Sequence, residues 1–353
     1  MNKNFKVVFS KARGALMVVN ELTSSVQVKG TKTVIAAAVA SVVAGTAVAD
    51  TNTNVFEGKT EYTDSSLFQA WTTTDVGQPL EVSGNTYRNN HVVFPTTSGS
   101  PTALGVAARD ANVSIIDSTF TANKVEDQVG SQNGVYGSAV GVQNGKLTVS
   151  GSTFTENNAT SYRQVQGSAI YQSIGSIEIN GSKFIGNTGA AAQETNANVT
   201  GGAVSLWGVQ GAIKNTQFND NVATAKETVY GGALYLRSGV WGGDDRLTFC
   251  IEDSSFSNNK TVATSSHKSG SLGGAVYAKS DLVKNSEGKV THKLINLELK
   301  NVTFNKNESN WMGGALFVSG EGSVNMNNVT FEGNKSSAGG AAMFYGNKQN
   351  ESS

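Results

Sequence analysis

A repeated unit that fills most of this chain constrains its fold more than any other feature. Residues 201–221, GGAVSLWGVQGAIKNTQFNDN, form one copy, which begins with Gly-Gly-Ala, continues with alternating apolar residues and ends on Phe-x-x-Asn. The aromatic motif recurs eight times, at Tyr87, Phe120, Phe154, Phe184, Phe218, Phe256, Phe304 and Phe331. Such self-similarity is typical of solenoids, in which each unit is stable only when stacked on its neighbours.

Three segments of the unit have the patterns of β-strands. Mostly aliphatic residues seven and five positions before the aromatics indicate a strand with one apolar face. A sharp bend between this strand and a second, aromatic strand is predicted three residues before each aromatic. That position holds only Gly, Asn or Asp, which tolerate a left-handed backbone: Gly84, Asp117, Gly151, Gly181, Asn215, Asp253, Asn301 and Asn328. A third strand follows the Gly-x-Ala triplets at Gly105, Gly137, Gly167, Gly201, Gly231, Gly273, Gly313 and Gly339. The segment between Phe-x-x-Asn and the next triplet is interpreted as a polar loop of variable length.

Three strands, one sharp bend and one variable loop predict an all-β fold, a right-handed single-stranded parallel β-helix of about eight coils. Its handedness follows from the usual handedness of parallel crossovers. Residues stacked about 4.8 Å apart should form an internal phenylalanine ladder and a hydrogen-bonded asparagine ladder. An antiparallel sandwich or propeller does not explain why one residue type recurs at one place in every unit.

The N-terminus has the features of a secretory signal. Residues 30–49 contain an apolar run after basic residues, and Ala47 and Ala49 stand before Asp50 in the small-residue cleavage pattern. The alternative, a membrane anchor, is disfavoured because the run is short and rich in alanine and glycine. We predict a signal region over residues 1–49, a cap over residues 50–79 and β-helix repeats over residues 80–353.

Charge and composition exclude several classes of function. The residues after position 49 include 21 basic and 26 acidic ones without basic clusters, which argues against nucleic acid as a partner. Cys250 is the single cysteine, so no internal disulfide can form. The three histidines are scattered without zinc-ligand spacing, no phosphate loop or nucleophile elbow occurs, and we expect no cofactor.

The first residues resemble a known export leader, the extended signal peptide region of large Gram-negative autotransporters, which use type V secretion. The resemblance rests on Met1-Asn2-Lys3, Val7-Val8, Lys11-Ala12-Arg13-Gly14 and Glu21-Leu22. It implies a Gram-negative source, export by the Sec machinery, and delivery to the cell surface.

The repeats resemble those of the polymorphic outer membrane proteins, autotransporter adhesins of chlamydiae. Gly-Gly-Ala-aliphatic paired with Phe-x-x-Asn carries this resemblance over residues 80–345. It implies a surface-exposed or secreted passenger, and an outer-membrane translocator barrel in the full-length protein. The barrel pattern is absent here and the last triplet lacks its Phe-x-x-Asn, so we expect a truncated form of a longer autotransporter.

Two groups of residues are candidate sites. Asp244 and Asp245, followed by His267, are similar to the acids of β-helical glycosidases, but they also fit a solvated turn. A stripe of aromatic residues two positions past the alanine of the triplets is predicted on the outside of the strands, broken at Ser205: Tyr171, Tyr235, Tyr277 and Phe317. It is a stacking ladder that stiffens the sheet, a row covered by the variable loop, or a binding surface for a host protein or glycan.

These patterns predict a non-catalytic, adhesin-like passenger with a role in virulence, located at the cell surface, in the outer membrane or outside the cell. The alternatives are a secreted β-helical polysaccharide-active enzyme and a nonfunctional truncated remnant.

Overall fold

The computed structural model describes residues 5–10, 15–20, 54–58, 60–62, 72–94, 105–127, 134–193, 196–239, 246–265, 270–284 and 290–346. The chain divides into two compact units, residues 1–46 and residues 47–353. In the first unit, β1 (Phe5–Ser10) and β2 (Ala15–Asn20) form an antiparallel hairpin. The predicted cleavage residues Ala47, Ala49 and Asp50 lie outside the described residues, and the predicted domain boundaries stay predictions.

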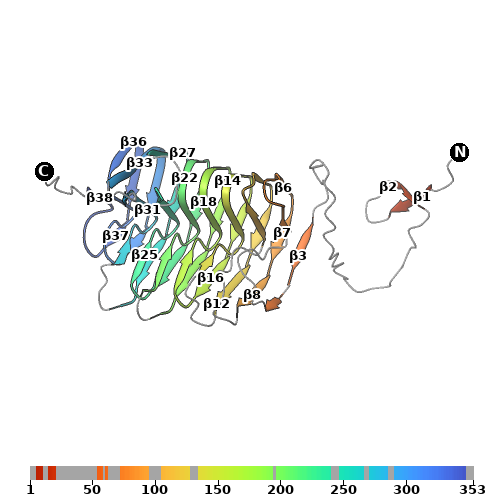
Figure 1. The fold of residues 1–353 in the computed structure, drawn as a ribbon, viewed down its shortest axis with the longest axis horizontal. Helices are drawn as coiled ribbons and strands as arrows, with labels where there is room; N and C mark the ends of the chain where they lie inside the picture. The colour runs from red at the N-terminus through yellow and green to blue at the C-terminus, as the bar shows by residue number, and fades with distance from the viewer. Residues whose placement is uncertain are drawn as a thin grey trace. The chain divides into compact units, whose positions relative to one another are not determined.

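The second unit is all-β, and its parallel strands stack in successive coils (Figure 1). In the described part of this unit, every strand pairing is parallel except that of β32 (Asp281–Lys284) with β33. The strands between triplet and bend are β5 (Thr72–Thr73), β6 (Leu80–Ser83), β9 (Val106–Arg109), β10 (Val113–Ile116), β14 (Val140–Ser150), β18 (Ile170–Asn180), β22 (Val204–Lys214), β26 (Leu234–Arg237), β27 (Arg246–Glu252), β31 (Val276–Lys279), β33 (Val290–Asn305), β35 (Leu316–Ser319), β36 (Gly322–Glu332) and β38 (Ala342–Tyr345). This arrangement confirms the parallel β-helix, whose handedness and number of coils stay predictions.

The aromatic motifs form their own row of strands in the same sheet. They are β3 (Val55–Glu57), β7 (Thr86–Arg88), β11 (Thr119–Thr121), β15 (Thr153–Thr155), β19 (Lys183–Ile185), β23 (Gln217–Asn219) and β28 (Ser255–Ser257), and β33 and β36 continue through the bend into this row. From Tyr87 to Phe256 each ring stacks on the next at 4.7 Å between centroids. The internal ladder is confirmed, and Phe56 adds a ring that the sequence pattern missed because no asparagine follows it.

The asparagine ladder is also present, and its amides are fully hydrogen-bonded inside the fold. Asn187 illustrates it: Nδ2 donates to Oδ1 of Asn221 and to the carbonyl of Phe154, and Oδ1 accepts from the backbone N–H and Nδ2 of Asn157. The same contacts join Asn90, Asn123, Asn157, Asn187, Asn221, Asn259, Asn307 and Asn334. Buried polar groups are tolerated when they are paired in this way.

The sharp bend lies where it was predicted. All eight residues three positions before the aromatic have positive φ, between 46° and 64°. A second left-handed position precedes the asparagine of each motif and escaped prediction because it includes Ala122, Glu156 and Lys306. Such residues seldom adopt this conformation. The asparagine beside each of them fixes the turn through its amide hydrogen bonds.

Two further sheets lie where the sequence predicted only a variable loop. The larger contains β4 (Thr60–Tyr62), β8 (His91–Phe94), β12 (Lys124–Asp127), β16 (Asn158–Ser161), β20 (Thr188–Ala191), β24 (Val222–Ala225), β29 (Lys260–Ala263), β34 (Glu308–Ser309) and β37 (Lys335–Ser336). The smaller contains β13 (Val135–Tyr136), β17 (Gln164–Gln166), β21 (Asn198–Thr200), β25 (Thr228–Tyr230) and β30 (Ser271–Leu272). Their common core consists of alanines and valines such as Ala159, Ala223 and Val229, so the sequence of these segments has the polar character of loops.

The register of the first triplet is wrong by two residues in the sequence alignment, which placed it from Gly105 to Ala107. Val106 pairs with Val140, so Gly105 occupies the alanine position of the triplet. A Cβ at Gly105 would lie 2.7 Å from the Phe120 ring, which is closer than carbon atoms pack. Glycine is therefore required where the other coils have alanine.

Candidate functional site

The predicted aromatic stripe lies on the outer side of its strands, and three of its four members are stacked and covered there. Tyr235, Tyr277 and Phe317 are 2%, 4% and 4% exposed, and their rings stack on one another. Tyr171 is half-buried beneath Tyr136. The parity of the strand was correct, but other side chains cover the stripe.

These covering side chains belong to the smaller sheet. They stand immediately before each triplet, on adjacent strands, and are Tyr136, Gln166, Thr200, Tyr230, Leu272 and Met312. Tyr230, for example, stacks on Tyr277 at 4.7 Å. The outward-facing corner between this row of residues and the strands that follow the triplets is called the crease.

The crease is interrupted in one coil, where the two facing residues are small and polar. Thr200 and Ser205 occupy the positions that hold Tyr230 and Tyr235 in the next coil. Their hydroxyl oxygens are 3.1 Å apart, and both side chains are buried. A cavity of about 300 Å³ is lined by Thr200 together with Tyr230 and Tyr235 of the next coil, but not by Ser205.

Two ladders of side chains from successive coils line this cavity. The ladder on the smaller sheet consists of Gln164, Asn198 and Thr228. The ladder on the strands after the triplets consists of Trp207, Arg237 and Lys279. Arg163, Asn196, Glu227, Tyr230 and Tyr235 complete the lining with Thr200.

Two cations of the cavity, Arg237 and Lys279, lie beside one buried carboxylate, Asp281. Asp281 accepts hydrogen bonds from Nε of Arg237 at 2.7 Å and from the backbone N–H of Gly239 at 3.2 Å. Burial opposes the charge of Arg237, but the hydrogen bond to Asp281 and the electrostatic interactions with Tyr235, Asp281 and Tyr277 together outweigh it, so the pKa of Arg237 is raised. The guanidinium lies 4.4 Å from the centre of the Trp207 ring, a cation–π contact.

On the strands after the triplets, the remaining hydrogen-bonding capacity of the cavity is that of donors. Within the described residues, the Nη groups of Arg237 make no hydrogen bond, and the buried Nε1–H of Trp207 has no acceptor. Burial and the charge of Arg237 lower the pKa of Lys279, whose Nζ lies 3.8 Å from Asp281. Burial raises the pKa of Tyr230 and Tyr235, which keeps their phenols neutral. The arrangement suits an acceptor-rich ligand.

The sequence alone did not single out Trp207, Arg237, Lys279 or Tyr230. A signal was present, because Trp207, Arg237 and Lys279 stand two residues beyond Ser205, Tyr235 and Tyr277 on the same outward parity. The catalytic candidates Asp244, Asp245 and His267 lie outside the described residues. Cys250 aligns with Thr148, Glu178 and Glu298 on the outer parity, as predicted, and burial raises the pKa of its thiol.

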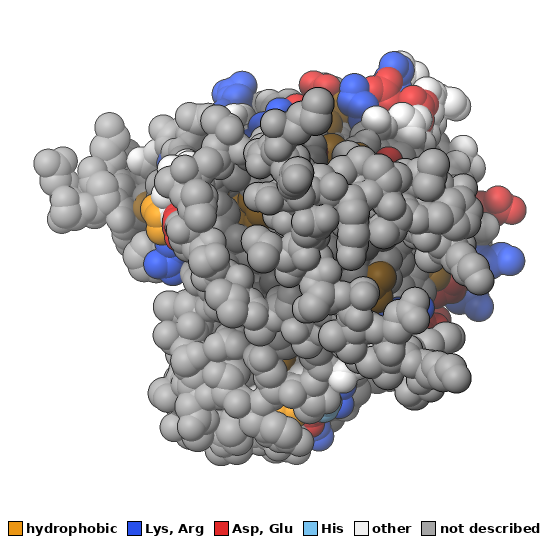
Figure 2. All heavy atoms as spheres, turned by 90° about the vertical axis from the view of Figure 1, so that its right-hand side faces the viewer, with side chains coloured by type: hydrophobic (Ala, Val, Ile, Leu, Met, Phe, Trp, Pro, Cys, Tyr) orange, Lys and Arg blue, Asp and Glu red, His pale blue; other side chains and the backbone are white. Residues whose placement is uncertain are grey.

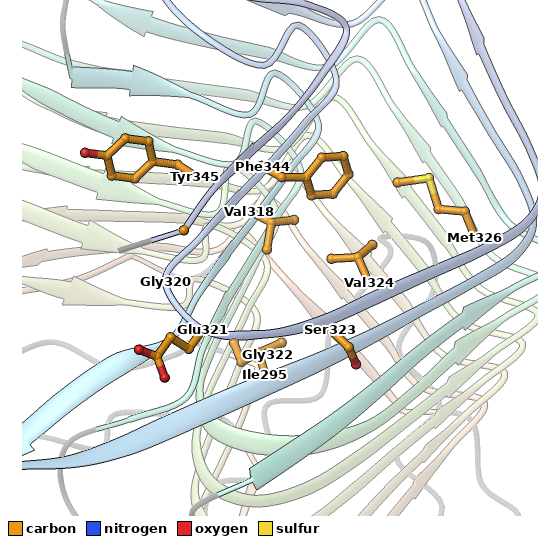
Figure 3. Close-up of a pocket in the computed structure, with 11 residues that line it drawn as sticks. Ile295, Val318, Gly320, Glu321, Gly322, Ser323, Val324, Met326, Phe344 and Tyr345 are labelled. Carbon is orange, nitrogen blue, oxygen red and sulfur yellow. The ribbon is translucent and has the colours of Figure 1, made fainter. Parts of the chain in front are cut away.

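A second hollow, of about 470 Å³, lies at the last described coil. Figure 3 shows Val318, Val324, Met326 and Phe344 facing the same space. Val318 and Val324 belong to inward-facing rows of the core, so this hollow is an end of the core and not a cluster of reactive groups.

The outer surface otherwise carries paired charges. Lys146 contacts Glu178 and Lys214 contacts Glu252 across neighbouring coils. Basic and acidic side chains lie beside one another on the described surface visible in Figure 2. Among the described residues no group of three or more His, Cys, Asp or Glu could hold a metal ion. None of them forms a helix long and apolar enough to cross a membrane.

The leader and the stacked coils define the class of this protein, an exported β-solenoid. Residues 1–50 match the extended signal peptide of the type V secretion system, and residues 253–279 match the Chlamydia polymorphic membrane protein repeat. The two matches support an autotransporter passenger of the polymorphic membrane protein type, an exported outer-membrane or surface protein. Such a leader implies Sec export, and a translocator in the full-length proteins.

The repeat match spans Phe256, Asn259 and the triplet at Gly273, so it falls on elements that the structure places in the core and turns. Neither the comparison with curated proteins nor that with solved structures finds a match.

Proposed function

We propose that this chain is a non-catalytic, adhesin-type passenger that binds its ligand in the crease, at the cavity beside Thr200. One observation carries the proposal: the row of aromatic side chains is interrupted between Tyr171 and Tyr235, and a cavity lined by cationic, amide and indole groups lies beside Thr200 in that coil. Aromatic and arginine side chains in such hollows are the residues that most often dominate binding energies.

The rest of the coil supports a role in presentation. The cavity ladders stand on strands that pair in register with the next coil on both sides of the crease, so the cavity is lined by residues on regular, hydrogen-bonded strands. A preorganised site loses less conformational entropy on binding than a flexible one. The regular coils thereby act as a scaffold, and the residues that depart from the repeat bind the ligand.

The test compares the full chain with a Thr200→Tyr variant for attachment to intact epithelial cells. Tyrosine is the residue of the next coil, and here it should fill the cavity while stacking on Tyr230. We expect saturable, self-competed attachment by the wild type and at least tenfold weaker attachment by the variant. Absence of saturable attachment by the wild-type chain contradicts the proposed function.

A further inference from the structure

The cavity beside Thr200 has the dimensions of a site for one small ring. Its volume, about 300 Å³, is at the lower end of the range for ligand pockets. It is bounded along the solenoid by Tyr230 and Tyr235 of the following coil, both parts of the stacked crease. A ligand with a single ring and its substituents therefore fits, whereas a folded partner can insert only one residue.

The polar lining favours a ligand that is rich in acceptors and anionic. Arg237 retains its Nη donors, because only Nε is bonded to Asp281 within the described residues. Lys279 is 37% exposed and stands one coil further along the same ladder. Asp281 lies behind them, 5% exposed, so a ligand meets the cations and not the carboxylate. A planar guanidinium matches a carboxylate through two parallel hydrogen bonds.

The facing ladder supplies neutral groups at the same spacing. Gln164, Asn198 and Thr228 present amides and a hydroxyl, which can both donate and accept. Such groups match the ring hydroxyls of a sugar, which also donate and accept. The backbone N–H of Asn196 donates to Glu227 at 2.8 Å, so this carboxylate of the lining is held by the protein.

We propose that this cavity binds a carboxylate-bearing sugar residue of an acidic glycan. This inference rests on the proposed function and names its ligand class. The carboxylate is bound by Arg237 and Lys279, and the ring hydroxyls contact the amide ladder. Trp207, held by the guanidinium of Arg237, forms the apolar side of the site.

The experiment measures binding of the full chain to two pairs of oligosaccharides by calorimetric titration. Each pair differs mainly in the charged group: sialyllactose with lactose, and a glucuronic acid oligosaccharide with its carboxyl-reduced form. We expect at least one acidic member to bind and its neutral partner to bind at least tenfold more weakly. Equal binding of both members of each pair, or no binding of either acidic sugar, overturns the proposal.

Two variants locate the binding, and one serves as a matched control. Thr200→Tyr fills the cavity, and Lys279→Gln removes a charge at a partly exposed position. Each should weaken binding of the acidic sugar at least tenfold, while circular dichroism shows an unchanged fold. Lys146→Gln removes a lysine that pairs with Glu178 outside the cavity, and should leave binding unchanged. Wild-type affinity in folded Thr200→Tyr overturns the proposal.

Competitors separate the sugar from other anions. Sodium acetate or inorganic phosphate that competes as well as the acidic sugar shows a simple anion pocket, and an acidic peptide that binds more tightly shows a protein ligand. Either result overturns the proposal that the ligand is an acidic sugar. If cell attachment is lost in Thr200→Tyr while no acidic sugar binds, the proposed function stands and this inference fails.

Discussion

The asparagine ladder allows the cost of one substitution to be calculated from its contacts. Asn221→Ala removes two hydrogen bonds that Nδ2 donates, to Phe184 and Asn259, and two that Oδ1 accepts from Asn187. The backbone N–H of Asn187 then has no acceptor among the described residues, which costs about 1–3 kcal/mol for a buried group. With the three other lost bonds at about 0.5–1.5 kcal/mol each, we expect about 5 kcal/mol of destabilisation.

Asn334→Ala is the matched control. Asn334 accepts from the backbone N–H and Nδ2 of Asn307 and donates to Phe304, but it is half-buried at the last described motif. Water can replace these partners, so the expected loss is about 1 kcal/mol. Urea unfolding of the full chain, followed by circular dichroism, measures both variants. Equal destabilisation of the two variants refutes the reasoning that burial makes the ladder essential.

Three other perturbations test the packing. Gly202→Ala should be strongly destabilising in thermal unfolding because its Cβ would lie 1.9 Å from a backbone oxygen of the next coil, whereas Gly340→Ala should be mild, since its nearest contact is 3.4 Å. Phe218→Ala should cost about 3–5 kcal/mol in urea unfolding and Phe331→Ala less, because Phe331 is only half-buried. Burial raises the pKa of Tyr171 to about 12 from 10, so the folded state retains this proton where the unfolded state loses it. Stability should fall as pH rises from 10 towards 12, and a Tyr171→Phe chain should fall less steeply in unfolding midpoints measured across that range.

Much of the coil was predictable because its constraints are the same in every repeat. The phenylalanine, the asparagine and the bend residue each meet one local structural requirement, and each recurs at a fixed position in the repeat. The two additional sheets were missed because Ala159 and Ala223 leave no strong apolar alternation in the sequence. Alanine fits a narrow core and a solvent-exposed loop equally well, so its presence does not distinguish the two.

The crease could be predicted only in part, for a different reason. The period of two assigned Tyr235 and Tyr277 to the outer side of their strand, which is correct. It did not show that Tyr230 and Leu272, which precede the triplets, fold over that side. Which face a residue occupies is a local property, whereas what packs against that face depends on chain that returns from another sheet.

The break at Thr200 and Ser205 has a consequence for the assembly of the fold. Rungs of identical phenylalanines and asparagines can pair with any other such rung, so a shift by a whole coil retains most of their contacts. Positions that differ between coils penalise that shift: Gln172 stands in an inward-facing row that holds Leu206 and Leu236 in the next coils, and its amide bonds to Gly145 and Ser176. Positions that differ between coils therefore fix the order in which the coils stack. The coil with Thr200 and Ser205 fits at only one place in that order.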